Sequence, residues 1–206
     1  MAETARRYAG QSADERDAGR RRRLLDAGLE LFGTVGYSGT SVERLCSNAK
    51  VSTRHFYLLY ANKEAAFLDV YDEINRKSLE GALAELSATE TEPMRVRLPR
   101  TVLAYLTPMV EDMRAAKIAF IEVMGVSPRV EERRLAQREA LVDLVTAEGA
   151  QAVIRGETTD RDFRFATLAL AGGANAIIYD WAVSGGGDAT ELKKKIAGLA
   201  VTLMTA

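Results

Sequence analysis

The feature that most constrains this chain is a pair of very short helical segments separated by a turn of only a few residues. In residues 42–49 apolar residues recur one helical turn apart, and Thr40 with Glu43 fits a capping box at the start. Residues 53–59 form the second segment, which Ser52 is suited to cap. The apolar face of the first segment comprises Val42, Leu45, Cys46 and Ala49. Two short helices joined this tightly have the build of a helix-turn-helix, whose second helix lies in the major groove of DNA.

The rest of the chain shows helical periodicity nearly everywhere and no convincing alternation of the kind that marks a strand. Glycine, proline and capping residues divide it into further helices. Nine helices are expected in all, at about residues 17–35, 40–49, 53–59, 62–87, 94–113, 114–124, 129–154, 159–184 and 188–204. We therefore predict an all-α fold with three parts: a flexible N-terminal arm at 1–15, a three-helix helix-turn-helix domain at 16–63, and a larger helical domain at 64–206.

Charge is distributed unevenly along the 206 residues. Residues 1–63 contain 11 Lys and Arg against 7 Asp and Glu, a balance of +4, whereas the remainder has a balance of −5. The basic end is where a polyanionic partner is expected, although the arginine run at 20–23 also suits a solvated helix start. The first twenty residues lack the apolar run of a secretory signal, and the longest uncharged stretch, 165–179, is too short to cross a bilayer. We expect a cytoplasmic protein with no membrane partner.

Residues 24–66 also show a specific set of features in a fixed order. These are Leu31-Phe32 before Gly36-Tyr37, the Thr40-Ser41 helix start, the Val51-Ser52 entry to the second short helix, the Phe56-Tyr57 pair and Asn62-Lys63-Glu64. In order and spacing this segment resembles the N-terminal DNA-binding domain of the TetR family of transcriptional regulators. The resemblance implies a dimeric repressor whose larger domain binds an effector and dimerises. It also implies a palindromic double-stranded DNA operator and release when a small molecule enters the larger domain.

The chain departs from the family pattern at three positions. Lys50 stands in the turn where the family usually has glycine, and a non-glycine residue held at positive φ costs about 1 kcal/mol. We expect a slightly reshaped turn that leaves Lys50 able to reach a phosphate. Leu59 and Tyr60 stand where histidine and phenylalanine are common, and the first change removes one possible phosphate contact.

The predicted DNA contacts divide into two groups. The base readers are Thr53, Arg54 and His55, because the first turn of a helix in the major groove meets the base edges. Arg54 is the strongest candidate, since its guanidinium can bind guanine O6 and N7 together. The predicted phosphate contacts are Thr40, Ser41, Lys50, Ser52, Tyr57 and Lys63. Several of these are also helix caps, and Tyr57 could be partly core.

Two further sites are predicted in the larger domain. Aromatic and flexible apolar walls with a few polar groups are typical of a site for an apolar small molecule. The pocket residues that we predict are Tyr105, Met109, Phe120, Met124, Leu141, Asn175, Tyr179 and Trp181. Small residues and a leucine stripe on the last two helices suit a four-helix dimer interface, or else close the core of one chain. The residues predicted for that interface are Gly172, Gly173, Ala176, Leu192, Ile196, Leu199 and Leu203.

Catalytic chemistry finds little support in the sequence. His55 is the only histidine and Cys46 the only cysteine, so a metal site or a catalytic pair would depend on them. We expect Cys46 to be core, and we predict neither enzyme activity nor a cofactor or metal. Glu122, between two apolar residues, is either a solvated or paired carboxylate or one that faces a ligand. Two alternatives to a DNA-binding regulator stay open: a small helical enzyme that uses the pocket, and a helical adaptor that binds another protein.

Overall fold

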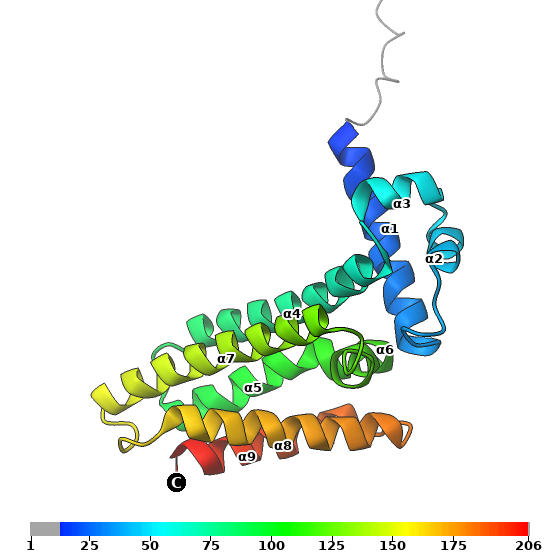
Figure 1. The fold of residues 1–206 in the computed structure, drawn as a ribbon. Coiled ribbons are helices and arrows are strands. Elements are labelled where there is room, and N and C mark those ends of the chain that lie inside the picture. Colours follow the sequence, from blue (N-terminus) through cyan, green and yellow to red (C-terminus); the bar gives the residue numbers. More distant parts are fainter. Residues whose placement is uncertain (1–12, 206) are drawn as a thin grey trace, which may run out of the picture.

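The computed structural model describes residues 13–205, which fold as helices joined by short turns (Figure 1). This confirms the predicted all-α fold for that part of the chain, whereas most of the predicted N-terminal arm lies outside it. The helices are α1 (Ala13–Thr34), α2 (Val42–Ala49), α3 (Thr53–Leu59), α4 (Lys63–Ala88), α5 (Met94–Val110), α6 (Met113–Lys117), the π-helical turn η1 (Ile118–Glu122), α7 (Pro128–Ile154), α8 (Phe163–Val183) and α9 (Ala189–Thr205).

The first three helices pack on the start of α4 to form a small N-terminal head. Its core is aromatic: the rings of Phe32 and Phe67 meet edge to face at 5.2 Å, and Phe56 is completely buried. Of the two residues at the predicted helix start, Ser41 caps α2, since its hydroxyl accepts from the Arg44 backbone N–H, and Thr40 does not form the predicted capping box with Glu43. α3 is capped by Ser52, as predicted.

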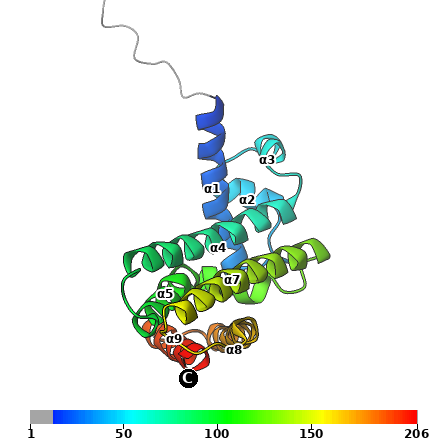
Figure 2. The same ribbon diagram turned by 90° about the vertical axis from the view of Figure 1, so that its left-hand side faces the viewer.

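α4 leaves the head and continues into the body, which comprises α5–α9 (Figure 1). Within the body, α5 packs against both α4 and α9, and α7 packs against α8. Turning the view shows α8 and α9 together at the end of the molecule away from the head (Figure 2). Among the described residues, no helix combines the length and apolar character that a membrane span requires.

The body differs from expectation in the segment between α5 and α7. One helix was predicted at 114–124, but the structure has the short α6 followed at once by η1. A π-helical turn widens the backbone hydrogen-bonding pattern and is frequent at functional sites. α8 also begins at Phe163 rather than near residue 159, because Asp162 supplies the N-cap by accepting from the Phe165 N–H.

Candidate DNA interface and effector cavity

The first turn of α3 presents the three predicted base readers at the surface of the head. Thr53 and Arg54 are exposed and His55 is half-buried. The Ser52 hydroxyl lies 2.7 Å from His55 Nδ1 and also accepts from the His55 backbone N–H. Ser52 therefore orients the imidazole as well as capping the helix. Further along α3, Tyr57 is 55 % exposed and Leu58 is 70 % exposed, so this whole face of the helix is open.

Two of the side chains predicted to contact phosphate form hydrogen bonds within the head instead. Thr40 is only 2 % exposed, and its hydroxyl donates to the Gly36 carbonyl at 2.8 Å. The Lys63 ammonium donates to the carbonyls of Tyr37 and Thr40 at 2.8 and 2.9 Å and lies 4.0 Å above the Tyr37 ring. Partial burial lowers the pKa of Lys63. Both side chains hold the turn between α1 and α2 together, which corrects the expectation that they face DNA.

Lys50 occupies the predicted turn between the two short helices. Its backbone is left-handed, with φ 53° and ψ 44°, and it is the only non-glycine residue at positive φ between residues 13 and 205. Its N–H closes α2 by donating to the carbonyls of Cys46 and Ser47. The turn thus keeps the geometry for which glycine is usual, without the reshaping that we expected. The Lys50 side chain is exposed.

The sequence analysis overlooked exposed polar side chains on α2, the other helix of the motif. Ser47 and Asn48 point to solvent near the start of α3, and Arg44 is held by a hydrogen bond to the Gly39 carbonyl at 2.9 Å. Their positions opposite the apolar stripe of α2 were visible in the periodicity. The open face of α3 also includes Leu58, which was not among the predicted contacts.

In the body, seven of the eight predicted pocket residues line one cavity of about 320 Å³, which we call the polar chamber. Trp181 is the exception. Its ring lies against the turn after α8, with Nε1 about 3.4 Å from where a Cβ of Gly187 would stand. Gly185 and Gly186 both have positive φ, and this tight turn brings the chain back over the indole. The predicted role of Trp181 in this chamber was therefore wrong.

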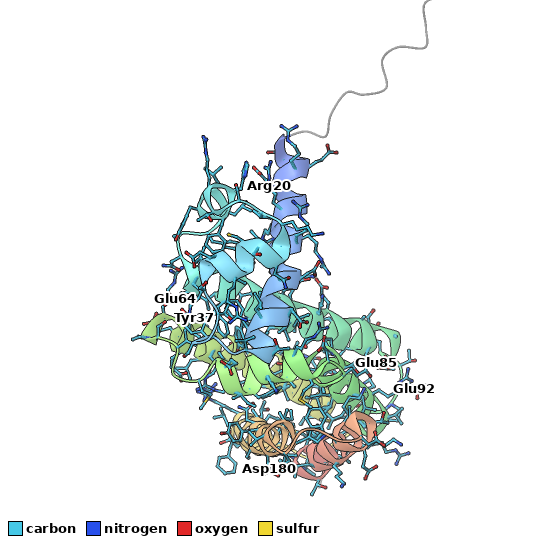
Figure 3. The ribbon with its side chains drawn as sticks, turned by 90° about the vertical axis from the view of Figure 1, so that its right-hand side faces the viewer. Arg20, Tyr37, Glu64, Glu85, Glu92 and Asp180 are labelled. Atoms are coloured by element: carbon cyan, nitrogen blue, oxygen red, sulfur yellow. The ribbon has the colours of Figure 1, made fainter. Side chains whose placement is uncertain are left out.

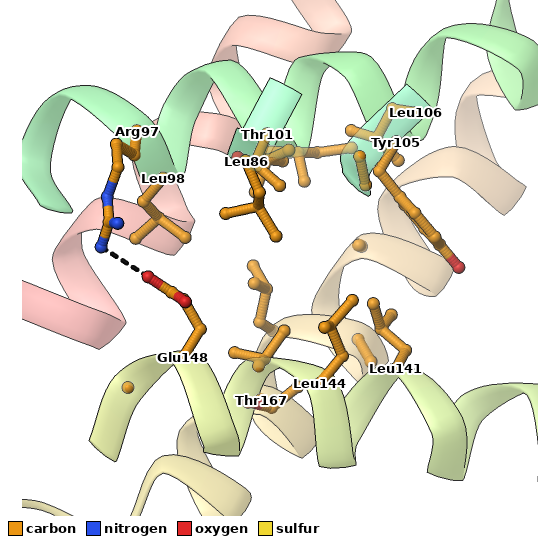
Figure 4. Close-up of a pocket in the computed structure, with 18 of the residues that line it drawn as sticks. Leu86, Arg97, Leu98, Thr101, Tyr105, Leu106, Leu141, Leu144, Glu148 and Thr167 are labelled. Atoms are coloured by element: carbon orange, nitrogen blue, oxygen red, sulfur yellow. Dashed lines mark ion pairs between the residues drawn. The ribbon is translucent and has the colours of Figure 1, made fainter. Parts of the chain in front are cut away.

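A second cavity of about 120 Å³, the apolar chamber, lies in the body among side chains of α4, α5, α7, α8 and α9 (Figure 4). Five residues line both chambers, which places the two side by side: Tyr105, Leu106, Leu141, Ala171 and Ala174. Burial raises the pKa of the Tyr105 phenol, in keeping with its position between them. Sequence reasoning missed the cations of the polar chamber, Arg134 and Arg138, because one turn of α7 carries them among other charged residues.

The predicted dimer interface is divided by the structure into buried and open residues. Leu192 and Ile196 are 6 % and 1 % exposed and belong to the core of their own chain, which corrects their assignment to an interface. By contrast, Gly172 and Ala176 are exposed on α8, and Gly173, Leu199 and Leu203 are half-buried. The exposed side of α8 also carries large apolar side chains, namely Phe165, Ile177, Tyr179 and Val183. In Figure 3, Asp180 marks this end of the molecule, away from the head.

The head and the body meet at the C-terminal end of α1. The Arg114 guanidinium on α6 pairs with Glu30 at 2.6 Å and with Asp112 at 2.7 Å. Gly33 lies so close to α6 that an added Cβ would stand 2.6 Å from the Arg114 Cα. Glu122 lines neither chamber and forms no ion pair within the described structure; it accepts a hydrogen bond from the backbone N–H of Tyr37, which lies at this junction (Figure 3).

Comparison with known proteins agrees with this architecture. Residues 24–70 match the family model described as bacterial regulatory proteins, tetR family, which confirms the resemblance found in the head. No curated protein sequence matches the chain significantly.

Solved structures of transcriptional regulators share the fold over most of their length. A putative TetR-family regulator from Syntrophomonas wolfei superposes with a TM-score of 0.79 at 15 % identity, covering 91 % of this chain and 96 % of that one. The fatty acid degradation regulator FadR of Bacillus halodurans gives 0.77 at 17 % identity, with 88 % and 94 % covered. FadR of Bacillus subtilis, solved in complex with stearoyl-CoA, gives 0.75 at 14 % identity, with 89 % and 97 % covered.

Proposed function

Because this chain carries the head domain and the fold of the tetR family of bacterial regulatory proteins, we propose that it is a ligand-responsive DNA-binding transcriptional repressor. The observation that carries the proposal is the placement of two sites in one chain. A capped α3 has an open face at one end, and a cavity lined by polar and aromatic groups lies in the body at the other. The fold is that of regulators rather than of enzymes, so the cavity is proposed to be an effector site.

The open face of α3 supports DNA binding by the head. Arg54 is exposed at the first turn, where a recognition helix in the major groove meets base edges. Arg54 and the cap-oriented His55 have the donors that guanine and phosphate oxygens accept. Exposed Lys50, Ser52 and Tyr57 surround them and can hold the backbone phosphates.

The exposed face of α8 supports assembly as a homodimer. An added Cβ at Gly172 meets nothing within 4 Å, so a partner helix can approach closely there. The large apolar side chains along the same helix favour burial against a second copy. A two-fold dimer has two heads, and two heads in successive major grooves require a palindromic operator.

The continuity from cavity wall to head supports release by a ligand. Phe120 of η1 lines the polar chamber, and Glu122 of the same turn binds the head. A ligand shifts the equilibrium between DNA-binding and released states only by its difference in affinity for them. The Bacillus subtilis relative, solved with stearoyl-CoA, is consistent with a body that accommodates a small molecule.

Selection of bound fragments from random duplex DNA tests the proposal directly. With the full-length protein, we expect a palindromic consensus whose half-sites are one helical turn apart, or a multiple of it. Recovery of no enriched sequence, at a salt concentration low enough for nonspecific binding to be seen, would contradict the function. An enriched but non-palindromic sequence would contradict the dimeric mode of binding.

A further inference from the structure

The two neighbouring chambers differ sharply in charge. Arg134 and Arg138 line the polar chamber, and no Asp or Glu is among the residues that line it. The Arg134 guanidinium donates two hydrogen bonds, of 2.6 and 2.8 Å, to the carboxylate of Glu131 on the same helix. Arg138, in contrast, forms no ion pair within the described part of the chain, and its Nε is buried without a hydrogen-bond partner.

The carboxylates nearest to Arg138 are already engaged. Hydrogen bonds from Arg134 and Arg164 lower the pKa values of Glu131 and Glu139, and the charge of Arg138 contributes to both shifts. Their first partners are nevertheless Arg134 and Arg164, the latter bound to Glu139 through two nitrogens. A half-buried guanidinium with an unused donor lacks a compensating group, and a ligand anion supplies both charge and acceptors.

The apolar chamber has no unpaired charge. Its lining is mostly leucine, valine and alanine, and at one end Arg97 pairs with Glu148 at 2.5 Å (Figure 4). Glu157 lies 3.4 Å from the same guanidinium nitrogen, so the charge of the buried Arg97 is compensated within the protein, although its Nε, like that of Arg138, has no hydrogen-bond partner. A hydrocarbon chain suits these walls, since burying it costs no polar group its hydrogen bonds.

Helix α7 contributes to the walls of both chambers. Arg138, Leu141, Val145 and Glu148 recur at three- and four-residue spacing, so they share one face of the helix. Arg138 and Glu148 are about 15 Å apart along the helix axis. The cation thus lies one helical turn from the entrance to the apolar chamber.

We propose that the ligand of this cavity is an amphipathic anion, with a carboxylate head on Arg138 and a hydrocarbon chain of moderate length in the apolar chamber. Its role as effector rests on the proposed function, whereas its binding does not. The position of Arg138 favours an anion attached directly to the chain over one at the far end of a large head group. The Arg97–Glu148 pair sets the upper limit on chain length.

Calorimetric titration of the full-length protein tests the head group. The ligands are dodecanoate, dodecanol and dodecylammonium below their micelle concentrations. We expect dodecanoate to bind most tightly, and Arg138→Gln to weaken it by roughly tenfold or more, the range for a charge-assisted hydrogen bond, while dodecanol changes little. Arg129→Gln removes an exposed arginine from the start of α7, outside both chambers, and is the matched control. Equal affinity for dodecanoate and dodecanol, or an unchanged affinity in Arg138→Gln, overturns the proposal.

A second series tests the chain. Dodecanoate should bind more tightly than octanoate, because more apolar surface is buried, and more tightly than stearate, whose chain is longer than the separation of Arg138 and Glu148. Ala171→Phe fills the junction of the chambers and should remove this dependence on length, whereas Ala136→Phe on the exposed side of α7 should preserve it. Binding of dodecanoyl-CoA without binding of dodecanoate would place the anion at a distant phosphate and overturn the carboxylate assignment.

Operator gel shifts separate this inference from the proposed function. Tight dodecanoate binding with no loss of operator affinity would leave the cavity assignment standing and contradict the effector role. If the protein binds its operator but none of the anionic chains binds to it or releases it, the cavity assignment is contradicted and DNA binding by the head stands.

Discussion

The carboxylate of Glu122 accepts a hydrogen bond of 2.7 Å from the backbone N–H of Tyr37, joining the end of η1 to the loop between α1 and α2. A Cβ at Gly36 would lie 3.1 Å from both carboxylate oxygens, so the carboxylate fits closely against this loop. Phe120, two residues before Glu122, lines the polar chamber. A single π-helical turn therefore touches both the cavity and the head, where Lys63 binds the carbonyl of the same Tyr37.

We predict that Glu122→Ala uncouples the head from the cavity. It leaves the Tyr37 N–H without its acceptor, which costs about 1 kcal/mol of stability at a half-buried site. The ratio of operator affinities without and with a releasing ligand should fall toward one. Glu122→Gln keeps an acceptor oxygen and should retain part of the coupling, and Glu132→Ala, on the exposed surface of α7, is the control. Full coupling in Glu122→Ala would exclude this contact as the route.

We predict that Gly33→Ala destabilises the junction between α1 and α6. The new Cβ would stand 2.4 to 2.8 Å from the Cβ, Cα and carbonyl oxygen of Arg114, so the two helices must separate. Overpacking of this kind costs about 2 kcal/mol, or roughly 4–8 °C in Tm at a fixed protein concentration. Gly19→Ala, on the same helix with only a flexible arginine tip nearby, should leave Tm unchanged or raise it. A similar Tm for both variants would show that the contact is loose.

We predict that base reading and phosphate binding separate on the head. Arg54→Ala should cost about 1–3 kcal/mol of operator affinity and relax the preference at one base pair. Lys50→Gly should weaken binding to all DNA sequences alike and lower the slope of log affinity against log salt concentration by about 1. It should also raise the free energy of unfolding by up to about 1 kcal/mol, because φ is positive at this position. Operator selection and salt titrations measure these effects. An unchanged operator preference in Arg54→Ala would show that Arg54 does not read a base.

Lys63→Ala should behave differently from the other two variants. The Lys63 ammonium donates hydrogen bonds to the carbonyls of Tyr37 and Thr40, so its removal should lower the free energy of unfolding by about 1–3 kcal/mol. The salt slope of DNA binding should stay the same once the protein is folded. A slope lowered by about 1 with unchanged stability would restore the phosphate contact that the sequence predicted.

We predict that Gly172→Arg dissociates the proposed dimer without unfolding the chain. Open space around Gly172 accommodates the arginine in one chain, whereas a partner helix packed there cannot. Light scattering should give the monomer mass while the helical circular dichroism is retained. Leu192→Arg places a charge in the core of the chain and should unfold it instead. An unchanged dimer in Gly172→Arg would exclude this face as the interface.

Much of the fold was accessible from the sequence because its signals are local. Ser52 caps α3 as predicted, Asn62 caps α4 at the predicted helix start, and apolar periodicity placed Leu45, Cys46 and Ala49 on the buried face of α2. Capping and the helical period depend on neighbours within about one turn, so they can be read without the tertiary structure. The same locality made the head recognisable as a helix-turn-helix.

Tertiary packing decided which of several possible partners each side chain meets. Lys63 and Thr40 turned inward because the α1–α2 turn folds over them, and Leu192 and Ile196 met their own core because α9 packs on α5. A single amphipathic helix does not specify whether its apolar face meets its own chain or a partner. Likewise, only the convergence of α5, α7 and α8 placed Arg138 on the wall of a cavity, since residues distant in sequence form that wall.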